Sequence, residues 1–199
     1  MRPLHGGSAL TRSATAVFAT ALLLSGCHPA PPPRAAAAAP APPISMAALR
    51  GAAYRLAFDP TRTVRLVNGV YDDAGDVDAA MKVTTRMLDS VTTGTLPDDR
   101  AEAAVILVTN AGGSGNFYDL ALMADSEGTP QNLATVGLGD RVKVKHITLY
   151  ADSVAVTLVT HGPADPMCCP ALEVTRHFVL DRGRLIPTDK VRATGKDSA

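Results

Sequence analysis

The chain has 199 residues, of which 46% are hydrophobic and 19% are charged, and its formal net charge at neutral pH is zero. This composition excludes an intrinsically disordered chain. Aromatic residues make up only 4% and tryptophan is absent, which excludes a surface that stacks nucleic-acid bases. The first 43 residues have the composition of a leader and a linker, so one domain of ordinary size with a modest aliphatic core is expected after them.

The N-terminus has the features of a bacterial lipoprotein signal peptide. Arg2 and Arg12 precede an apolar run over residues 14–24, which is too short to span a bilayer, since spanning needs about 20 residues. The run ends in Leu-Ser-Gly-Cys, which resembles the lipobox, where the cysteine receives a diacylglycerol group before cleavage. We therefore expect residues 1–26 to be removed and Cys27 to carry the lipid, with palmitate-type acyl chains.

Loss of this leader changes the charge of the protein. Without Arg2 and Arg12, 17 of the 19 basic residues remain against 19 acidic residues, a net charge of −2. The basic residues are scattered singly, so no nucleic-acid partner is expected. The alternative to lipidation is an ordinary secretory signal with a chance cysteine. With lipidation, the protein is exported and anchored to the cell envelope, and its domain faces the periplasm or the exterior.

Residues 27–43 form a low-complexity tether of proline and alanine. Proline fixes φ and removes backbone donors, so this segment is expected to extend as polyproline II at about 3.1 Å per residue, reaching about 50 Å. We interpret it as a spacer that holds the domain away from the membrane, in preference to a ligand for proline-binding domains.

The first part of the domain mixes one short helix with short strands. Residues 47–53 can form a helical turn, and the chain then alternates apolar and polar residues between turn signals, as strands do. Strands are expected over residues 55–58, 63–68 and 70–72. Asn68-Gly69 is a favoured hairpin dipeptide. Residues 77–88 contain a helical apolar face but also several β-branched residues, which favour a strand.

The second part of the domain has a clearer strand pattern. Residues 103–109 are almost continuously apolar, which predicts a central strand covered on both faces. Further strands are expected over residues 117–124, 132–138, 142–149, 154–160, 173–180 and 185–186. We therefore predict a single mainly β domain over residues 44–190, an antiparallel meander that forms a sandwich, a barrel or a curved sheet with at most one or two short helices. Residues 191–199 are expected to be a flexible C-terminal tail.

The densest group of chemically active residues is the segment His-Gly-Pro-Ala-Asp-Pro-Met-Cys-Cys-Pro at residues 161–170. If Cys27 carries the lipid, the remaining cysteines are the neighbours Cys168 and Cys169, in an oxidising compartment. We therefore predict a vicinal disulfide between them. It can act as a clamp for a stiff loop or as a redox-active bond.

The same loop offers a competing set of soft metal ligands for Cu(I): His161, Met167, Cys168 and Cys169. Adjacent cysteine side chains in an extended chain point to opposite sides, which makes chelation of one ion awkward. No cofactor is therefore expected, with Cu(I) as the alternative. His146 and His177 fall within strand patterns, where a half-exposed sheet histidine is the simpler interpretation.

No catalytic group is recognised in the sequence. The glycine-rich residues 112–115 lack the lysine of a phosphate-binding loop, and Asn116 replaces the last glycine of a nucleophile elbow, so we predict a hairpin turn. A hydrolase that uses Ser114 is the least favoured function. The acidic residues 72–78 depart from the calcium-loop pattern, and both this segment and residues 98–102 are interpreted as solvated turns. We expect no enzymatic activity.

Three segments together resemble an uncharacterised family of bacterial secreted or lipid-anchored envelope proteins. They are residues 112–121 with Gly-Ser-Gly-x-Phe-Tyr, residues 138–142 with Leu-Gly-Asp-Arg-Val, and residues 159–170 with the more specific Asp-Pro-Met-Cys-Cys-Pro. The resemblance covers residues 50–190 and implies no activity. Relatives often have a calcium-like loop rich in Gly and Asp before the apolar strand, whereas residues 96–102 here lack the glycines.

The function expected from these features is that of a cell-envelope lipoprotein. Its tethered β-domain would be a non-enzymatic binding or accessory module for an envelope protein or glycan, with the membrane contacted through the N-terminal lipid. The alternative is a periplasmic redox or copper-handling protein that uses Cys168 and Cys169.

Overall fold

The computed structural model describes residues 42–73, 82–95, 100–166 and 168–193. All of them belong to residues 38–199, the second of the two units into which the chain divides. The elements are α1 (Met46–Arg50), β1 (Ala53–Arg55), β2 (Thr63–Arg65), β3 (Val70–Asp72), β4 (Val83–Thr95), β5 (Ala101–Ala111), β6 (Phe117–Ser126), β7 (Thr129–Asp140), β8 (Lys143–Leu149), β9 (Ser153–Thr160), β10 (Leu172–Asp181) and β11 (Arg184–Ala193). Within the described ranges, no helix is long and apolar enough to cross a bilayer.

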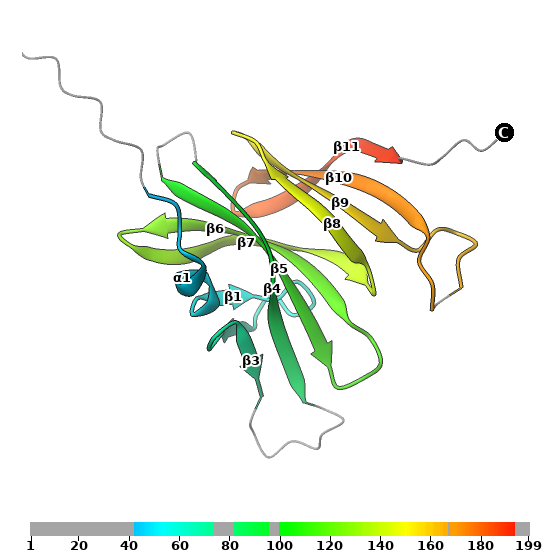
Figure 1. Ribbon diagram of the computed structural model, residues 1–199, viewed down its shortest axis with the longest axis horizontal. Coiled ribbons are helices and arrows are strands. Elements are labelled where there is room, and N and C mark those ends of the chain that lie inside the picture. The colour runs from blue at the N-terminus through cyan, green and yellow to red at the C-terminus, as the bar shows by residue number, and fades with distance from the viewer. Residues whose placement is uncertain (1–41, 74–81, 96–99, 167, 194–199) are drawn as a thin grey trace, which may run out of the picture. The chain divides into compact units, whose positions relative to one another are not determined.

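Two antiparallel sheets pack against each other (Figure 1). Strands β3 to β7 follow one another in a five-stranded meander, and β8 to β11 form a four-stranded one. Strand β8 contacts β4 and β5, while β11 contacts β7. Both sheets are open in the described part of the chain, and the two-stranded sheet of β1 and β2 is separate. The predicted mainly β, antiparallel meander is therefore confirmed, in the form of a sandwich of open sheets.

Helix α1 and the pair β1–β2 cover the outer face of the five-stranded sheet. The Ser45 hydroxyl accepts a hydrogen bond from the Ala48 N–H at 3.1 Å and caps the helix. The fully buried Tyr54 donates its hydroxyl to the Leu49 carbonyl oxygen at 2.8 Å. Burial raises the pKa of this hydroxyl, so it remains protonated and fastens β1 to the helix.

Strand β5 is buried on both faces, as the apolar run over residues 103–109 predicted, and the neighbouring β6 is buried on both faces as well. Successive side chains of a strand point to opposite faces. Leu107 accordingly packs with α1 and β1–β2, whereas Ile106 packs with the four-stranded sheet, and neither is exposed. The five-stranded sheet is thus the middle layer of three, with a separate hydrophobic cluster on each side.

The predicted turn at Asn68-Gly69 is confirmed by its backbone angles. Asn68 and Gly69 have φ angles of 52° and 84°, the two positive values that a type I′ hairpin turn requires. The pairs Glu127-Gly128 and Arg182-Gly183 connect β6 to β7 and β10 to β11 in the same way, with positive φ at both residues.

Some boundaries differ from the predictions. Asp140 and the glycine before it belong to β7, and the chain turns at Arg141, which has a φ of 52°. Strand β4 begins at Val83, while residues 77–81 of the predicted strand lie outside the described residues. Strand β11 runs to Ala193 and so enters the segment expected to be a tail.

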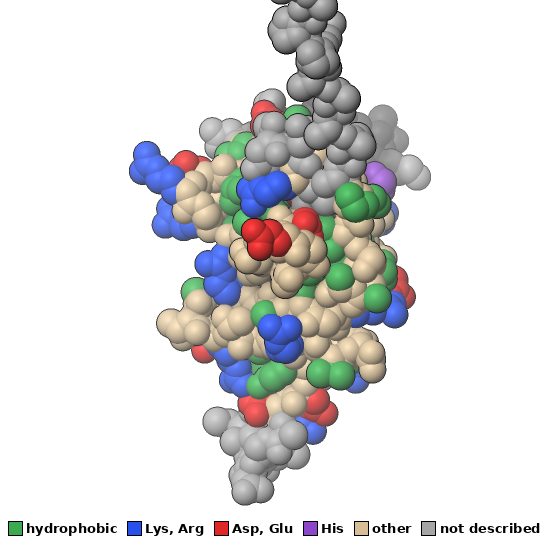
Figure 2. All heavy atoms as spheres, turned by 90° about the vertical axis from the view of Figure 1, so that its left-hand side faces the viewer, with side chains coloured by type: hydrophobic (Ala, Val, Ile, Leu, Met, Phe, Trp, Pro, Cys, Tyr) green, Lys and Arg blue, Asp and Glu red, His purple; other side chains and the backbone are tan. Residues whose placement is uncertain are grey.

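Charge and apolar surface are mixed on the face seen in Figure 2. Basic and acidic side chains are interspersed there, and hydrophobic side chains form small separate groups. The large hydrophobic side chains that remain exposed in the described ranges are Met46, Phe58, Val67, Val70, Phe117, Tyr150 and Leu180. Four of them line two openings that are described below.

Candidate functional site

The β5–β6 turn, the β7–β8 corner and the described part of the β9–β10 loop lie at one end of the sandwich. Lys143, the first residue of β8, pairs with Val159 near the end of β9. The last residue of β9, Thr160, pairs with Leu172 at the start of β10. The β9–β10 loop therefore starts beside the β7–β8 corner. The corner in turn contacts the β5–β6 turn, since the Arg141 N–H donates to the Asn116 carbonyl oxygen at 2.9 Å. Only tight turns connect β6–β7 and β10–β11 at the other end.

The cysteines of the β9–β10 loop form the predicted vicinal disulfide. Cys168 is bonded to Cys169, and their Cα atoms are 3.8 Å apart. Both residues are exposed. The bond is therefore accessible to thiols in solution, and it lies outside the two hydrophobic clusters.

Asp165 holds the base of this loop together. Its Oδ2 accepts hydrogen bonds from the N–H groups of Gly162 at 2.8 Å and Ala171 at 2.7 Å, which lie on either side of the disulfide. These two bonds, with a smaller contribution from the charge of His161, lower the pKa of the Asp165 carboxyl. The ionised carboxylate is thus a second constraint on the loop besides the disulfide.

The alternative Cu(I) site is only partly placed. His161 is half-buried, and Met167 lies outside the described residues. The two cysteines are bonded to each other, so neither offers a thiolate. In the ranges that the structure describes, no three His, Cys, Asp or Glu side chains come together as metal ligands. Cu(I) binding at this loop would first require reduction of the disulfide.

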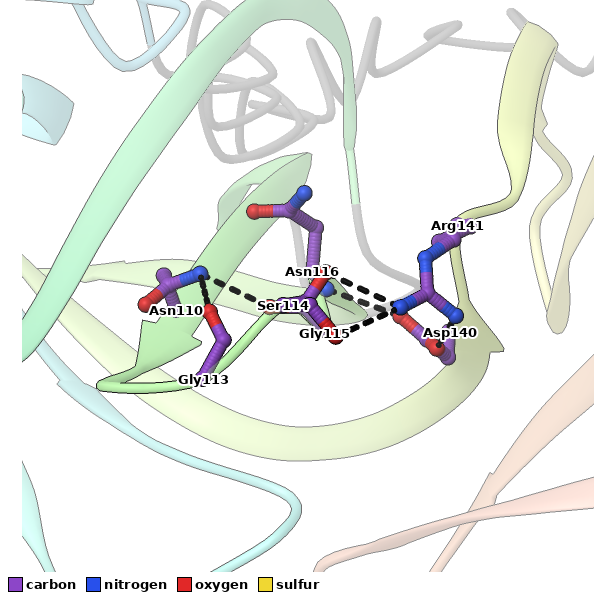
Figure 3. A network of polar contacts seen from close by, with 7 residues as sticks. All are labelled: Asn110, Gly113, Ser114, Gly115, Asn116, Asp140 and Arg141. Atoms are coloured by element: carbon purple, nitrogen blue, oxygen red, sulfur yellow. Dashed lines mark hydrogen bonds and ion pairs between the residues drawn. The ribbon is translucent and has the colours of Figure 1, made fainter. Parts of the chain in front are cut away.

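The glycine-rich segment forms the predicted turn between β5 and β6, and side-chain hydrogen bonds fix its shape (Figure 3). The Asn110 Nδ2 donates to the carbonyl oxygens of Gly113 and Gly115, each at 2.9 Å. The Asn110 Oδ1 accepts a hydrogen bond from the Gly112 N–H at 3.0 Å. A single asparagine thereby closes the turn.

Arg141 connects this turn to the β7–β8 corner. Its Nη1 pairs with Asp140 Oδ2 at 2.7 Å, and its Nη2 donates to the carbonyl oxygen of Ser114 at 3.0 Å and to its hydroxyl at 3.2 Å. The Asn116 N–H donates to Asp140 Oδ1 at 2.8 Å. The Ser114 hydroxyl thus acts as an acceptor for Arg141 and helps to tie the turn to the corner.

The first acidic segment is described only at its beginning. Asp72, the last residue of β3, pairs with Lys82 at 3.0 Å, and Asp73 pairs with Arg62. The remaining residues of the segment 72–78 lie outside the described residues. The two aspartates that are described are thus partnered by basic side chains.

For the second acidic segment, the prediction of a solvated turn is wrong at Glu102. Glu102 is the second residue of β5 and pairs in the ladders with Gly94 of β4 and Ala124 of β6. Its side chain is only 4% exposed, so the expected solvated turn is wrong for this residue. The strand extends past the apolar run because neighbouring strands on both sides supply partners for its backbone. Asp98 and Asp99 lie outside the described residues.

An apolar opening lies between the two sheets at the end with the tight turns. Its volume is about 240 Å³. Besides Glu102, its main lining side chains are Leu122, Tyr150, Val154, Phe178, Leu180 and Leu185. Tyr150 is 50% and Leu180 is 38% exposed at the mouth. Exposed apolar side chains beside a concave apolar wall are typical of a site that accepts an apolar group.

The two histidines predicted to lie in strands do so. His146 is in β8, and His177 is in β10, where its ring stacks with Tyr150 at 6.4 Å between ring centroids. His177 therefore supports the mouth of the apolar opening from one side.

A second opening lies on the other face of the five-stranded sheet. Asp119 of β6 lies at its base, is only 2% exposed, and accepts a hydrogen bond from the Ala57 N–H at 3.0 Å on Oδ2. Burial raises the pKa of Asp119 to about 6, although the hydrogen bond from Ala57 acts in the opposite direction. Phe58 and Phe117 line this groove of about 270 Å³, with ring centroids 6.5 Å apart.

Sequence analysis missed both openings. One signal for the second was present, because Asp119 interrupts the apolar alternation of β6 on the same face as Ala121 and Met123. An acid on an otherwise apolar strand face indicates a buried carboxylate. The first opening had no such signal, since its lining comes from both sheets.

Comparisons of this chain with protein-family models, with curated proteins and with solved structures find no match. Its function therefore has to be inferred from the geometry of three features, which are the exposed disulfide loop, the apolar opening between the sheets and the groove above Asp119.

Proposed function

We propose that the protein is an exported, lipid-anchored component of the bacterial cell envelope and that its sandwich is a non-enzymatic binding module. The apolar opening between the sheets is the observation that carries the binding role. A largely apolar concavity with a few polar groups at its rim is the usual form of a small-ligand site. A volume of about 240 Å³ suits one small neutral apolar group, such as an aromatic ring or a short acyl segment of an envelope component.

Three features support the envelope location. Cys27 follows the apolar leader in a lipobox-like sequence, and residues 27–43 have the proline and alanine composition expected of a tether. The disulfide between Cys168 and Cys169 fits an exported protein, because disulfides persist in oxidising compartments. A domain on such a tether can reach ligands at a distance from the bilayer.

The anchoring part is tested by fractionation of cells that express the protein with Cys27→Ser. Loss of the lipid-accepting thiol should move the protein from the membrane fraction to the soluble fraction. Retention of the variant in the membrane fraction would contradict anchoring through Cys27.

The binding part is tested with the neutral fluorescent probe N-phenyl-1-naphthylamine. Ala151 is exposed and lines the opening, so Ala151→Trp places a ring in the mouth. We expect this variant to bind the probe at least about tenfold more weakly. Val67→Trp is the matched control, because Val67 is 70% exposed and does not line the opening. Equal affinity of the two variants would contradict the proposed site.

The exposed disulfide favours a second candidate function, that of a redox protein. In this reaction two thiols of a partner lose two electrons and two protons and form a disulfide, while Cys168 and Cys169 gain them and become thiols. Intact mass measurement after incubation with a dithiol tests it, because the loop should gain two hydrogens while the sandwich stays folded. Titration of the reduced protein with Cu(I) tests the copper-handling version, and absence of binding would exclude it.

A further inference from the structure

Asp119 is a buried carboxylate with an incomplete set of partners. Its single hydrogen bond within the described residues comes from the Ala57 N–H to Oδ2, and it forms no ion pair with them. A carboxylate that is largely removed from water and has no cation beside it destabilises the fold. Oδ1 keeps contact with solvent, since no fully buried side-chain oxygen of the described residues lacks a hydrogen-bond partner. The other oxygen, Oδ1, is thus available to a donor that the described chain does not supply.

The neighbouring strand leaves Oδ1 uncovered. Strand β7 has a register shift here, since Tyr118 pairs with Gly139 and Asp119 pairs with Gly137. The residue between the two glycines, Leu138, is buried toward the four-stranded sheet. A Cβ atom on Gly137 would lie 3.8 Å from Asp119 Oδ1, so the missing side chain opens a path to this oxygen. β-Bulges, which change the direction of a side chain locally, recur next to functional sites.

Two aromatic rings form the rim above the carboxylate. Phe58 is 44% and Phe117 is 39% exposed, and both line the groove with Asp119. Aromatic faces attract cations through the ring quadrupole. A negative group at the base and aromatic rings at the rim favour a positively charged ligand with an apolar part.

We propose that this groove binds an organic ammonium group. Its N–H donates to Asp119 Oδ1 in a charge-assisted hydrogen bond, while its alkyl part lies against Phe58 and Phe117. A free amine and the lysine side chain of a partner present the same chemistry. This site and the apolar opening lie on opposite faces of the sheet, so either can fail without the other.

The ionisation of Asp119 is compatible with this role. A carboxyl with a pKa of about 6 is largely ionised in neutral solution. The ammonium of an alkylamine is protonated under the same conditions, so both charges of the pair are present before they meet.

The test is a titration of the full-length protein with n-butylammonium, followed by ¹H–¹⁵N NMR, with neutral n-butanol as the matched probe. We expect n-butylammonium to shift amide signals of residues 57–58, 117–119 and 137–139 in a saturable way, and n-butanol to leave them in place. Equal shifts from the two probes, or no saturable shift from the ammonium, would overturn the proposal.

Two variants test separately the charge of Asp119 and the access of the ligand to its Oδ1. Asp119→Asn keeps an oxygen acceptor for Ala57 but removes the charge, and we expect at least about tenfold weaker binding. Its control is Asp125→Asn on the same strand, where the carboxylate likewise accepts a backbone N–H, from Gly128 at 3.1 Å. Unchanged affinity of the Asp119 variant would overturn the proposal.

Gly137→Ala keeps the charge and obstructs the path. The added Cβ would be 3.6 Å from the Ala57 Cβ, an ordinary van der Waals distance, so the variant should fold. We expect it to lose n-butylammonium binding, whereas Gly113→Ala, whose Cβ meets no atom within 4 Å, should bind normally. Equal binding by the two alanine variants would contradict access through Gly137. Nα-acetyl-lysinamide distinguishes the two sources of the ammonium group. Its binding would assign a lysine side chain of a partner, whereas its failure to bind under conditions in which n-butylammonium binds would assign a free amine.

Discussion

Strand β6 contributes to two openings, one largely apolar and one with a buried carboxylate that has a raised pKa. Leu122 points toward the four-stranded sheet and lines the apolar opening, while Asp119 points to the other face and lies at the base of the groove. Residues separated by an odd number of positions on a strand face opposite sides of the sheet. The middle layer therefore keeps the site lined by Leu122 apart from the site at Asp119, although the two side chains are three positions apart in one strand.

The two openings also differ in what they do to stability. Exposed side chains such as Tyr150 and Leu180 at the apolar opening are common on protein surfaces and lower the stability of the fold only slightly. A buried, ionised Asp119 destabilises the folded state at neutral pH. Because a strongly perturbed carboxyl in a cleft is a candidate for function, the groove is the more informative of the two sites.

The largest effect on the free energy of unfolding is expected from two substitutions that test whether both faces of the middle layer are packed. Leu107→Ala and Ile106→Ala should each lower the free energy of unfolding by about 2–5 kcal/mol, because each side chain is fully buried in a different cluster. Urea unfolding measures this change, with Val67→Ala as the exposed control. A cost below about 1 kcal/mol for Leu107 alone would mean that α1 and β1–β2 do not form a packed layer.

The next effect concerns the charge in the groove. The pKa of Asp119 is raised from the ordinary 3.8 to about 6, so the folded protein binds a proton more tightly than the unfolded chain between these values. Its stability should therefore fall as the pH rises from 4 to 6. Asp119→Asn should remove this dependence and raise the free energy of unfolding at pH 7 by up to about 3 kcal/mol, with no gain at pH 4.

Urea unfolding between pH 4 and pH 7 measures this difference, and Asp125→Asn is the control on the same strand. An Asp119 variant with the same pH dependence as the original protein would show that the carboxyl is not desolvated. The comparison between the two openings would then lose its energetic basis.

A smaller effect is expected at the disulfide loop. The hydrogen bonds of Asp165 to Gly162 and Ala171 lower its pKa, so they are present above the ordinary pKa of aspartate and are lost as the pH falls through the lowered value. Asp165→Asn should weaken the base of the loop at neutral pH. We expect dithiothreitol to reduce Cys168–Cys169 severalfold faster, as followed by alkylation and mass spectrometry, while the unfolding midpoint of the sandwich stays the same. An unchanged rate would show that the carboxylate does not hold the loop.

The smallest effect is expected at the network of the β7–β8 corner. Arg141 contacts Asp140 and Ser114 at once with its planar guanidinium, which a lysine cannot reproduce. Arg141→Lys should lower the free energy of unfolding by about 1 kcal/mol or less, because the network is partly exposed. A loss several times larger would indicate that this corner, and not the middle layer alone, organises the fold.

The strands could be predicted from sequence because their signals are local. The apolar run over residues 103–109 indicated a strand covered on both faces. The dipeptide Asn68-Gly69 indicated directly the tight turn that it forms. The boundaries were less well predicted, since Glu102 is drawn into β5 by the neighbouring strands and not by its own side chain.

The candidate sites likewise divide into features that the local sequence predicts and features that only tertiary packing creates. The vicinal disulfide was predictable because the two cysteines are adjacent in the sequence. The groove was not, because the hydrogen bond between Ala57 and Asp119 joins residues 62 positions apart. Contacts of this kind follow from the packing of layers, which a strand pattern does not specify. The apolar opening likewise exists only after two meanders have been stacked.

The most direct test of the division between the two faces is one NMR experiment on the full-length protein with both probes. N-phenyl-1-naphthylamine should shift amide signals of residues 150–154 and 178–185, and n-butylammonium should shift those of residues 57–58 and 117–119. We predict that the two sets do not overlap and that each probe binds while the other is present. A common set of shifted signals, or competition between the probes, would contradict two separate sites.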